Sequence, residues 1–167
     1  MKNKIIICIA LFIFSNINKV NAQMYDGNND NIYTLGAEIN KKLYYCNLTA
    51  DIGLSDYISG GVFIKYLFNN PKPVESLFSK FLIGARLDVH GSNFFKLKKS
   101  DILLGYEYGV SYHGPHTEYR YAITDFFGFF GRAIYNINIS NEFADKSEIR
   151  APLSLEAGIH VRFFNGI

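Results

Sequence analysis

Apolar residues alternate with polar ones in one stretch after another along this chain, and the polar positions carry nearly all of the charge. Successive side chains of a β-strand point to opposite faces, so this pattern predicts a sheet with one apolar and one charged face. In the clearest stretch the charged face would carry Asp101, Glu107 and His113. The apolar face of that stretch would carry Ile102, Leu104, Tyr106, Tyr108, Val110 and Tyr112.

Eight such stretches are separated by turn residues such as Gly, Asn, Asp and Pro. Most are about 9–12 residues long, which is the length that a tilted transmembrane strand needs. The fold class is therefore predicted as all-β, an eight-stranded antiparallel up-and-down transmembrane β-barrel over residues 32–167. The predicted strands are about 32–40, 43–52, 57–68, 78–90, 101–112, 117–124, 129–140 and 153–164, with turns or loops at 53–56, 69–77, 91–100, 113–116, 125–128 and 141–152.

The N-terminus has the features of a secretory signal peptide. Lys2 and Lys4 precede an apolar run at 5–14, and small residues lead up to a predicted cleavage after Ala22. The run is shorter than the roughly 20 apolar residues of a transmembrane helix. Residues 1–22 would thus be removed on export, and 23–31 would form an N-terminal lead.

Removal of the signal peptide changes the charge balance. Three lysines leave with it, so 17 basic residues become 14 against 15 acidic ones, a net charge of −1. No basic patch favours nucleic acid as a partner. The mature chain keeps one cysteine, Cys46, so it can form no internal disulfide. Cys46 would lie on the apolar face as a small apolar filler.

Alternation alone does not say which face points outward. A secreted lipocalin-like binder of a hydrophobic ligand would have the apolar face inside, and a membrane barrel would have it outside. The absence of charge from the apolar face favours the membrane, because a charge at the bilayer midplane costs about 2–4 kcal/mol in such barrels. Tyrosines near strand ends favour it too, as interface girdles: Tyr33, Tyr44, Tyr66 and Tyr112. Outer-membrane lipid is the partner that this orientation predicts.

The last stretch is similar to the C-terminal signal that barrel-assembly machinery recognises during insertion. The matching positions are Glu156, Gly158, Val161 and Phe163, although the chain continues to Ile167 instead of ending on an aromatic residue.

Nearly the whole mature chain resembles the small outer-membrane β-barrel proteins of Bacteroidetes, porin-like and OmpA- or OmpX-like, and in particular an uncharacterised flavobacterial family. The residues that carry the resemblance are Ala22-Gln23, Tyr33–Ile39, Ile83–Leu87 and Phe127–Phe130. The resemblance implies an outer-membrane location and supplies no catalytic residues.

The charged face would line the lumen of the barrel. A barrel of eight strands is filled by its own side chains, so we expect these charges to form a buried network paired across adjacent strands. A narrow channel or transporter is the alternative. The predicted network contains Glu38, Lys65, Lys80, Arg86, Asp88, Glu107, Glu118, Arg120, Arg132, Glu156, His160 and Arg162.

Other candidate sites are weaker. His113 and His116 flank Gly114-Pro115, and we expect a solvated turn there and no metal site. Some barrels of this size are enzymes with a His-x-Ser pair on a late strand, but here His160 is followed by Val161 and Arg162. We therefore expect a protein with no enzymatic activity and no cofactor, in a structural or surface-interaction role. Loop 141–152 is the one plausible docking site for a surface partner.

Overall fold

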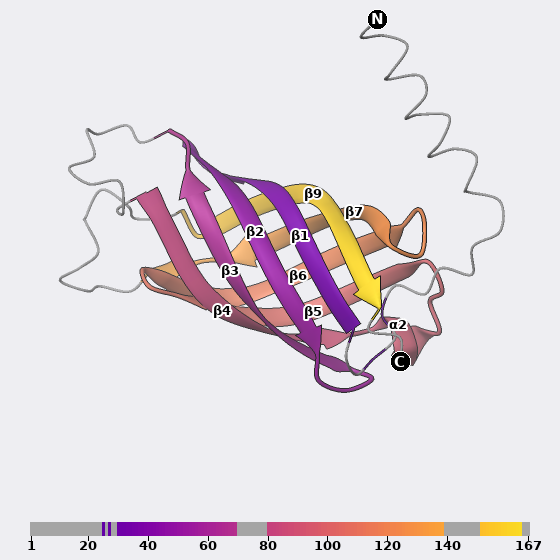
Figure 1. Ribbon diagram of the computed structural model, residues 1–167. Coiled ribbons are helices and arrows are strands. Elements are labelled where there is room, and N and C mark those ends of the chain that lie inside the picture. The colour runs from indigo at the N-terminus through magenta and orange to yellow at the C-terminus, as the bar shows by residue number, and fades with distance from the viewer. Residues whose placement is uncertain (1–24, 26, 28–29, 70–79, 139–150, 165–167) are drawn as a thin grey trace, which may run out of the picture.

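The computed structural model describes residues 25, 27, 30–69, 80–138 and 151–164. They form a closed antiparallel up-and-down barrel, in which β5 pairs with β6 and thereby joins the two edges of the sheet. Eight strand positions make up the wall, because the short β8 continues β7 and both pair with β6 (Figure 1). The strands are β1 (Asp30–Asn40), β2 (Leu43–Gly53), β3 (Ile58–Leu67), β4 (Phe81–His90), β5 (Ser100–Gly109), β6 (Tyr112–Ala122), β7 (Phe127–Tyr135), β8 (Ile137–Asn138) and β9 (Leu153–Phe164).

The predicted all-β fold, an antiparallel up-and-down barrel with eight strand positions, is confirmed. The chain turns at 41–42 and 110–111 at one end of the barrel, which we call the loop end. At the other end, the terminal end, β1 begins and β9 finishes, and a short helix α2 (Ser92–Phe95) lies between β4 and β5 (Figure 1). No helix in the described part of the chain is long and apolar enough to cross a membrane. The predicted signal peptide 1–22 and most of loop 141–152 lie outside the described residues.

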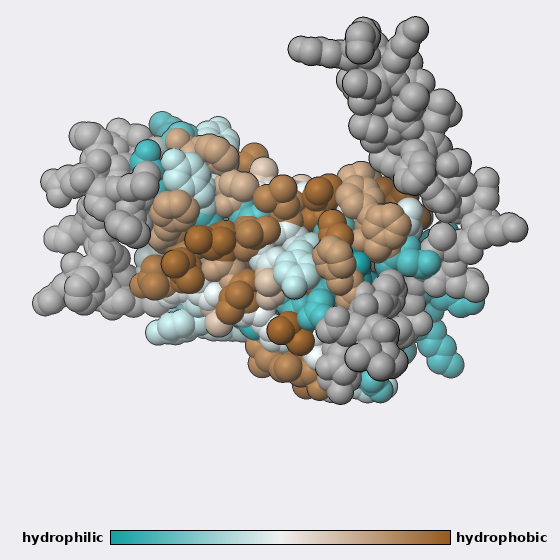
Figure 2. Space-filling view, viewed as in Figure 1, coloured by the Kyte–Doolittle hydropathy of each residue, from teal (hydrophilic) through white to brown (hydrophobic). Residues whose placement is uncertain are grey.

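The apolar face of the sheet is the outer face of the barrel. Val62 in the middle of β3 is 60% exposed and Leu48 in β2 is 50% exposed, whereas Lys65 and Glu107 are fully buried. Apolar side chains cover the strands on the face shown in Figure 2. The barrel is thus apolar outside and charged inside.

The predicted turn at 113–116 is wrong. β5 ends at Gly109, the chain reverses at Val110 and Ser111, and residues 113–116 lie inside β6. Pro115 has no N–H to donate, and it is tolerated because β6 has no partner on its β7/β8 side at residues 114–115. Gly114 fits there because any Cβ would collide with the Tyr135 carbonyl oxygen.

Because the chain reverses earlier than predicted, at Val110 and Ser111, two residues differ from the prediction in where their side chains lie. Tyr112 was predicted to lie on the lipid-facing side, but it is fully buried in the lumen. His116 was predicted to lie in a solvated turn, but its side chain is buried in the lumen as well. Both residues follow the alternation of β6 itself, in which Glu118 and Arg120 also point inward.

Several strand ends differ from the prediction by a few residues. β1 begins at Asp30, so part of the predicted lead 23–31 belongs to the wall. β4 begins at Phe81 and leaves Lys80 outside the strand. The predicted strand 129–140 starts earlier, at Phe127, and is interrupted at Asn136, whose side chain turns inward and bonds to Ser154.

Candidate functional site: the charged lumen

Most of the charge of the barrel is buried inside it. Eight carboxylates, five Lys or Arg side chains and three histidines are buried among the described residues. Lys80, which was predicted to join the interior, is only half-buried, whereas Asp30, which was not, lies inside. The buried groups are Asp30, Glu38, Asp51, Asp88, Asp101, Glu107, Glu118, Glu156, Lys65, Arg86, Arg120, Arg132, Arg162, His90, His116 and His160.

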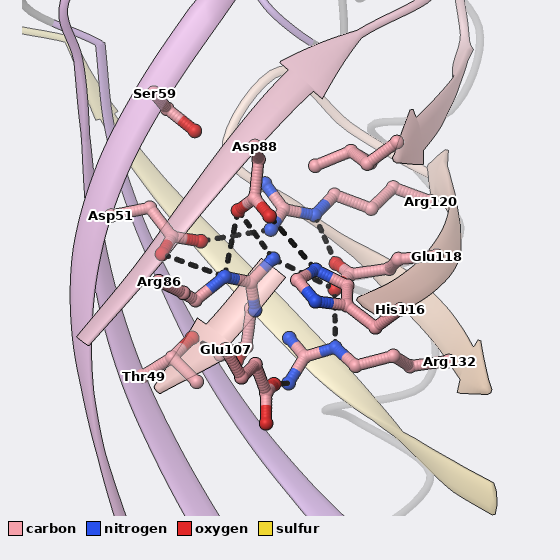
Figure 3. Close-up of polar contacts among 12 residues, drawn as sticks. Thr49, Asp51, Ser59, Arg86, Asp88, Glu107, His116, Glu118, Arg120 and Arg132 are labelled. Atoms are coloured by element: carbon pink, nitrogen blue, oxygen red, sulfur yellow. Dashed lines mark hydrogen bonds and ion pairs between the residues drawn. The ribbon is translucent and has the colours of Figure 1, made fainter. Parts of the chain in front are cut away.

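Glu118 of β6 is the centre of this network. Three guanidinium groups contact its carboxylate: Arg86 Nη2 at 3.1 Å, Arg132 Nε at 2.6 Å, and Arg120 Nε (Figure 3). Charge-assisted hydrogen bonds of this kind are the strongest that side chains make. One carboxylate therefore holds together arginines from three strands.

A second group of contacts surrounds Asp88 of β4. Its carboxylate accepts from Arg86 Nη2 at 2.6 Å and lies 2.8 Å from His116 Nε2 (Figure 3). Gly105, opposite Asp88 in the β4–β5 register, leaves the space that Asp88 and the His116 ring occupy. Asp51 of β2 lies across the lumen and accepts from Arg120 Nη2 at 2.8 Å. The arginines thus link β2 to the opposite wall.

Lys65 joins two acids nearer the loop end. Its Nζ lies 2.9 Å from both Glu38 and Glu107, and the Tyr112 hydroxyl donates to Glu107 at 2.7 Å. The ammonium group also lies 5.0 Å from the centre of the Tyr112 ring, a cation–π distance. An apolar cluster lies beyond these groups, formed by Leu43, Tyr45, Phe63, Leu67, Leu82, Tyr112 and Ile134.

Part of the pairing follows the predicted pattern of adjacent strands: Arg132 lies opposite both Glu118 and Glu156 in the strand register and contacts both. Other pairs reach further. Lys65 on β3 contacts Glu38 on β1 and Glu107 on β5, each two strands away.

Glu38 and Glu156 face each other directly in the β1–β9 register, where two acids would repel. Glu156 contacts Arg132 and Asn47 instead, at 3.0–3.1 Å. The barrel is narrow enough for long side chains to reach across it.

Ion pairs connect nine of the twelve residues predicted for the network. Arg162 lies at the terminal end and contacts Asp30 at 2.6 Å. His160 is buried, and its Nδ1 has no hydrogen-bond partner among the described residues. Lys80 is half-buried before β4, and no ion pair of Lys80 is found in the part of the chain that the structure describes.

The terminal end contains residues that the sequence reasoning missed. Tyr25, from the predicted lead, is 1% exposed and stacks on the His90 ring, with centroids 3.5 Å apart and planes 3° apart. Its hydroxyl lies 2.7 Å from the carbonyl oxygens of Ser55 and Ile58. Burial, with the negative charge of Asp30, raises the pKa of the Tyr25 hydroxyl. No periodic pattern extends to position 25, so alternation gave no signal for this contact.

The residues that line the lumen are mainly ionisable side chains. No group of three or more His, Cys, Asp or Glu suited to a metal ion occurs among the described residues. Cys46 is half-buried and free. The arrangement can hold charges in fixed positions, exchange protons between neighbouring acids and histidines, and obstruct the passage of ions.

One solved structure has the same fold. The crystal structure of the N-terminal β-barrel domain of Pseudomonas aeruginosa OprF superimposes with a TM-score of 0.57, covering 83% of this chain and 100% of that domain at 9% sequence identity. At this identity the likeness shows the fold alone. No protein-family model and no curated protein matches the sequence.

Proposed function

We propose that this protein is an integral outer-membrane β-barrel with a lumen filled by its own side chains, serving a structural or surface-interaction role. The observation that carries the proposal is the outward position of the apolar face. The outer wall includes Leu35, Leu48, Val62, Leu87, Leu104 and Leu155, each 48–64% exposed. A water-soluble protein rarely exposes apolar patches larger than a few hundred Å².

The energetics favour lipid as the surroundings of this wall. Each fully buried aliphatic side chain gains about 1.5–3 kcal/mol relative to exposure to water. The lipocalin-like alternative is disfavoured, because it would place this same face inside the barrel and the charges outside. In the structure Glu118 and Arg120 are inside and no more than 1% exposed.

Exposed aromatic residues near both ends of the wall fit interfacial girdles. At the loop end Tyr44 and Tyr135 are 47% and 54% exposed. At the terminal end Tyr33 and Phe163 pack edge to face, with ring centroids 5.6 Å apart. The apolar residues between the two sets would occupy the hydrocarbon layer.

The orientation follows from the general architecture of such barrels, in which chain termini and short turns face the periplasm. We assign the terminal end to the periplasm and the loop end to the outside. A surface partner would then meet the loop end, and loop 141–152 is our candidate contact. Insertion would use the barrel-assembly machinery through β9, where Phe163 is 56% exposed on the outer wall.

The localisation is tested by fractionating cells that express the full chain. Recovery with outer membranes that resists carbonate or urea extraction is expected. Recovery as a folded soluble protein would contradict the proposal. The matched variant Phe163→Ala should lower the amount inserted, because it removes the aromatic position of the predicted assembly signal, whereas Phe129→Ala on the same outer wall should not.

A narrow channel is the second candidate, because a chain of charged groups runs along the lumen. Closure by side chains is supported by the apolar cluster at the loop end, the arginine–carboxylate contacts in the middle and Tyr25 at the terminal end. Planar-bilayer recordings of the purified protein separate the two. No stable conductance is expected, and a reproducible single-channel step in the wild type would favour the channel.

A further inference from the structure

Three side chains near the terminal end form a hydrogen-bonded chain that the ion network does not use. Ser59 of β3, His90 of β4 and Asp101 of β5 come from adjacent strands. The Ser59 hydroxyl oxygen lies 2.7 Å from His90 Nε2, and His90 Nδ1 lies 2.5 Å from Asp101 Oδ2. All three are no more than 1% exposed.

The contacts of Asp101 define which atoms donate and which accept in this series of hydrogen bonds. Its Oδ1 accepts the Ser92 backbone N–H at 2.8 Å, and its Oδ2 accepts from His90 Nδ1. With the proton on Nδ1, the lone pair of Nε2 of the neutral ring faces the Ser59 hydroxyl and accepts its proton. A hydroxyl beside a base that a carboxylate orients is the arrangement of an activated serine nucleophile.

Tyr25 covers this arrangement. The Tyr25 ring lies flat on His90, and its hydroxyl contacts the Ser55 and Ile58 carbonyl oxygens on either side of the turn into β3. Gly27 adopts φ +98° and packs against Gly53, where a Cβ on Gly53 would collide with the Gly27 carbonyl oxygen. Tyr25 and Gly27 therefore lie against β2, β4 and the turn into β3.

We propose that Ser59, His90 and Asp101 form a serine nucleophile site for carboxylic esters, which the Tyr25 ring covers. Leu103, opposite His90 in the β4–β5 register, is fully buried and offers an apolar contact for the acyl group of an ester. The Ser59 side chain points into the lumen (Figure 3).

The reaction would proceed by two acyl transfers. Ser59 Oγ bonds to the ester carbonyl carbon while its proton passes to His90 Nε2, and the carbon–oxygen bond to the alcohol then breaks as that proton moves to the leaving oxygen. Water next gives a proton to His90 Nε2 as its oxygen bonds to the acyl carbon. The bond between that carbon and Ser59 Oγ then breaks, Oγ takes the proton back from His90, and the acid is released. Asp101 keeps the ring in place and balances the charge of the imidazolium.

A donor for the oxyanion is available nearby. Arg120 lies directly opposite Asp101 in the β5–β6 register, and its Nη1 has no hydrogen-bond partner among the described residues. A guanidinium N–H aimed at the charge that develops on the carbonyl oxygen lowers the barrier in a site shielded from water. We assign this donor to Arg120.

The test is labelling of the purified full chain in detergent with an alkyl fluorophosphonate, followed by mass spectrometry of the modified peptide. We expect an adduct on Ser59 in Tyr25→Ala under conditions in which the wild type stays unlabelled. Adding His90→Gln to Tyr25→Ala should lower the labelling rate by about 10²–10⁴-fold, the usual contribution of a general base. Tyr25→Leu is the second uncovered variant in case Tyr25→Ala does not fold, as judged by circular dichroism.

Two controls make the result specific. Ser154→Ala removes another fully buried lumen hydroxyl, which bonds to Asn40 and Asn136, and should leave labelling of the Tyr25 variant unchanged. Ser59→Ala should abolish it. An unlabelled Ser59 in both folded Tyr25 variants would overturn the site, and labelling of the wild type as fast as Tyr25→Ala would overturn the cover. Neither outcome bears on membrane insertion, which is measured separately.

Discussion

Glu118→Gln is the sharpest test of the ion network, because it removes one charge with little change in shape. In the wild type the Glu118 carboxylate contacts Arg86, Arg120 and Arg132. Glutamine keeps the volume and one acceptor oxygen, and so leaves no cavity. The variant therefore isolates the electrostatic part of the interaction.

The expected loss of unfolding free energy depends on the carboxylate contacts that the three arginines keep. Loss of one partner of a buried ion pair costs about 3–5 kcal/mol, because the other charge remains desolvated. Here no arginine is left alone, so we expect the lower limit, about 3 kcal/mol of unfolding free energy. The carboxylates that still contact these arginines are Asp51, Asp88, Glu107 and Glu156.

The assay is reversible urea unfolding in lipid vesicles, followed by tyrosine fluorescence. Asp125→Asn is the matched control, an exposed acid in the turn before β7 that should change the free energy by less than about 0.5 kcal/mol. A double-mutant cycle with Arg120→Met should give a coupling energy of about 0.5–3 kcal/mol between the two residues.

An unfolding free energy of Glu118→Gln within error of the wild type would refute this reasoning. Water would then have to solvate the arginines, and the lumen would be wet instead of filled by side chains. A positive conductance in the same variant but not in the wild type would support the filled lumen, since it would show that these contacts close the path.

Three further predictions address the wall, the packing and the lead. Val62→Arg should cost about 2–4 kcal/mol in vesicles, because a charge would face the bilayer midplane, and a cost below about 0.5 kcal/mol would argue for water around the barrel. Gly105→Ala should cost about 1–3 kcal/mol by overpacking, because its Cβ would collide with Asp88 and His116, whereas Gly131→Ala, whose Cβ would meet nothing closer than 4.0 Å, should be neutral. The pKa of Tyr25 is raised above its ordinary value of 10.0, so its hydroxyl should stabilise the folded state fully below pH 10 and progressively less as the pH rises above it. The stability difference between the wild type and Tyr25→Phe, measured on both sides of pH 10, checks this, and a difference independent of pH would contradict it.

The sequence by itself was enough to predict an eight-stranded barrel with one apolar and one charged face. This was possible because the alternation of side chains along a strand is a local property with a period of two. Val62 and Lys65 are assigned to opposite faces by their positions in the chain alone, and the structure places them so. The separation of charge from the apolar face likewise needs no knowledge of which strands are neighbours.

The ends of the strands depended on the tertiary structure. Gly114-Pro115 has the composition of a turn, yet it lies in β6. It can do so because the pairing of β6 with its neighbour is interrupted at Asn136, so no hydrogen bond from the proline nitrogen is required. That interruption belongs to another strand, so the local sequence does not report it. The burial of Tyr112 and His116 followed from this one difference.

The partners inside the lumen were also decided by the closed barrel. Alternation says that a side chain points inward, but not at which height along the axis it lies or what faces it across the lumen. Lys65 contacts Glu38 from β1 and Glu107 from β5 because a narrow closed barrel brings these three residues to the same height along its axis. Ser59, His90 and Asp101 lie 31 and 11 residues apart in the chain. Strand register alone, set by the pairing of β3, β4 and β5, brings their side chains within hydrogen-bonding distance.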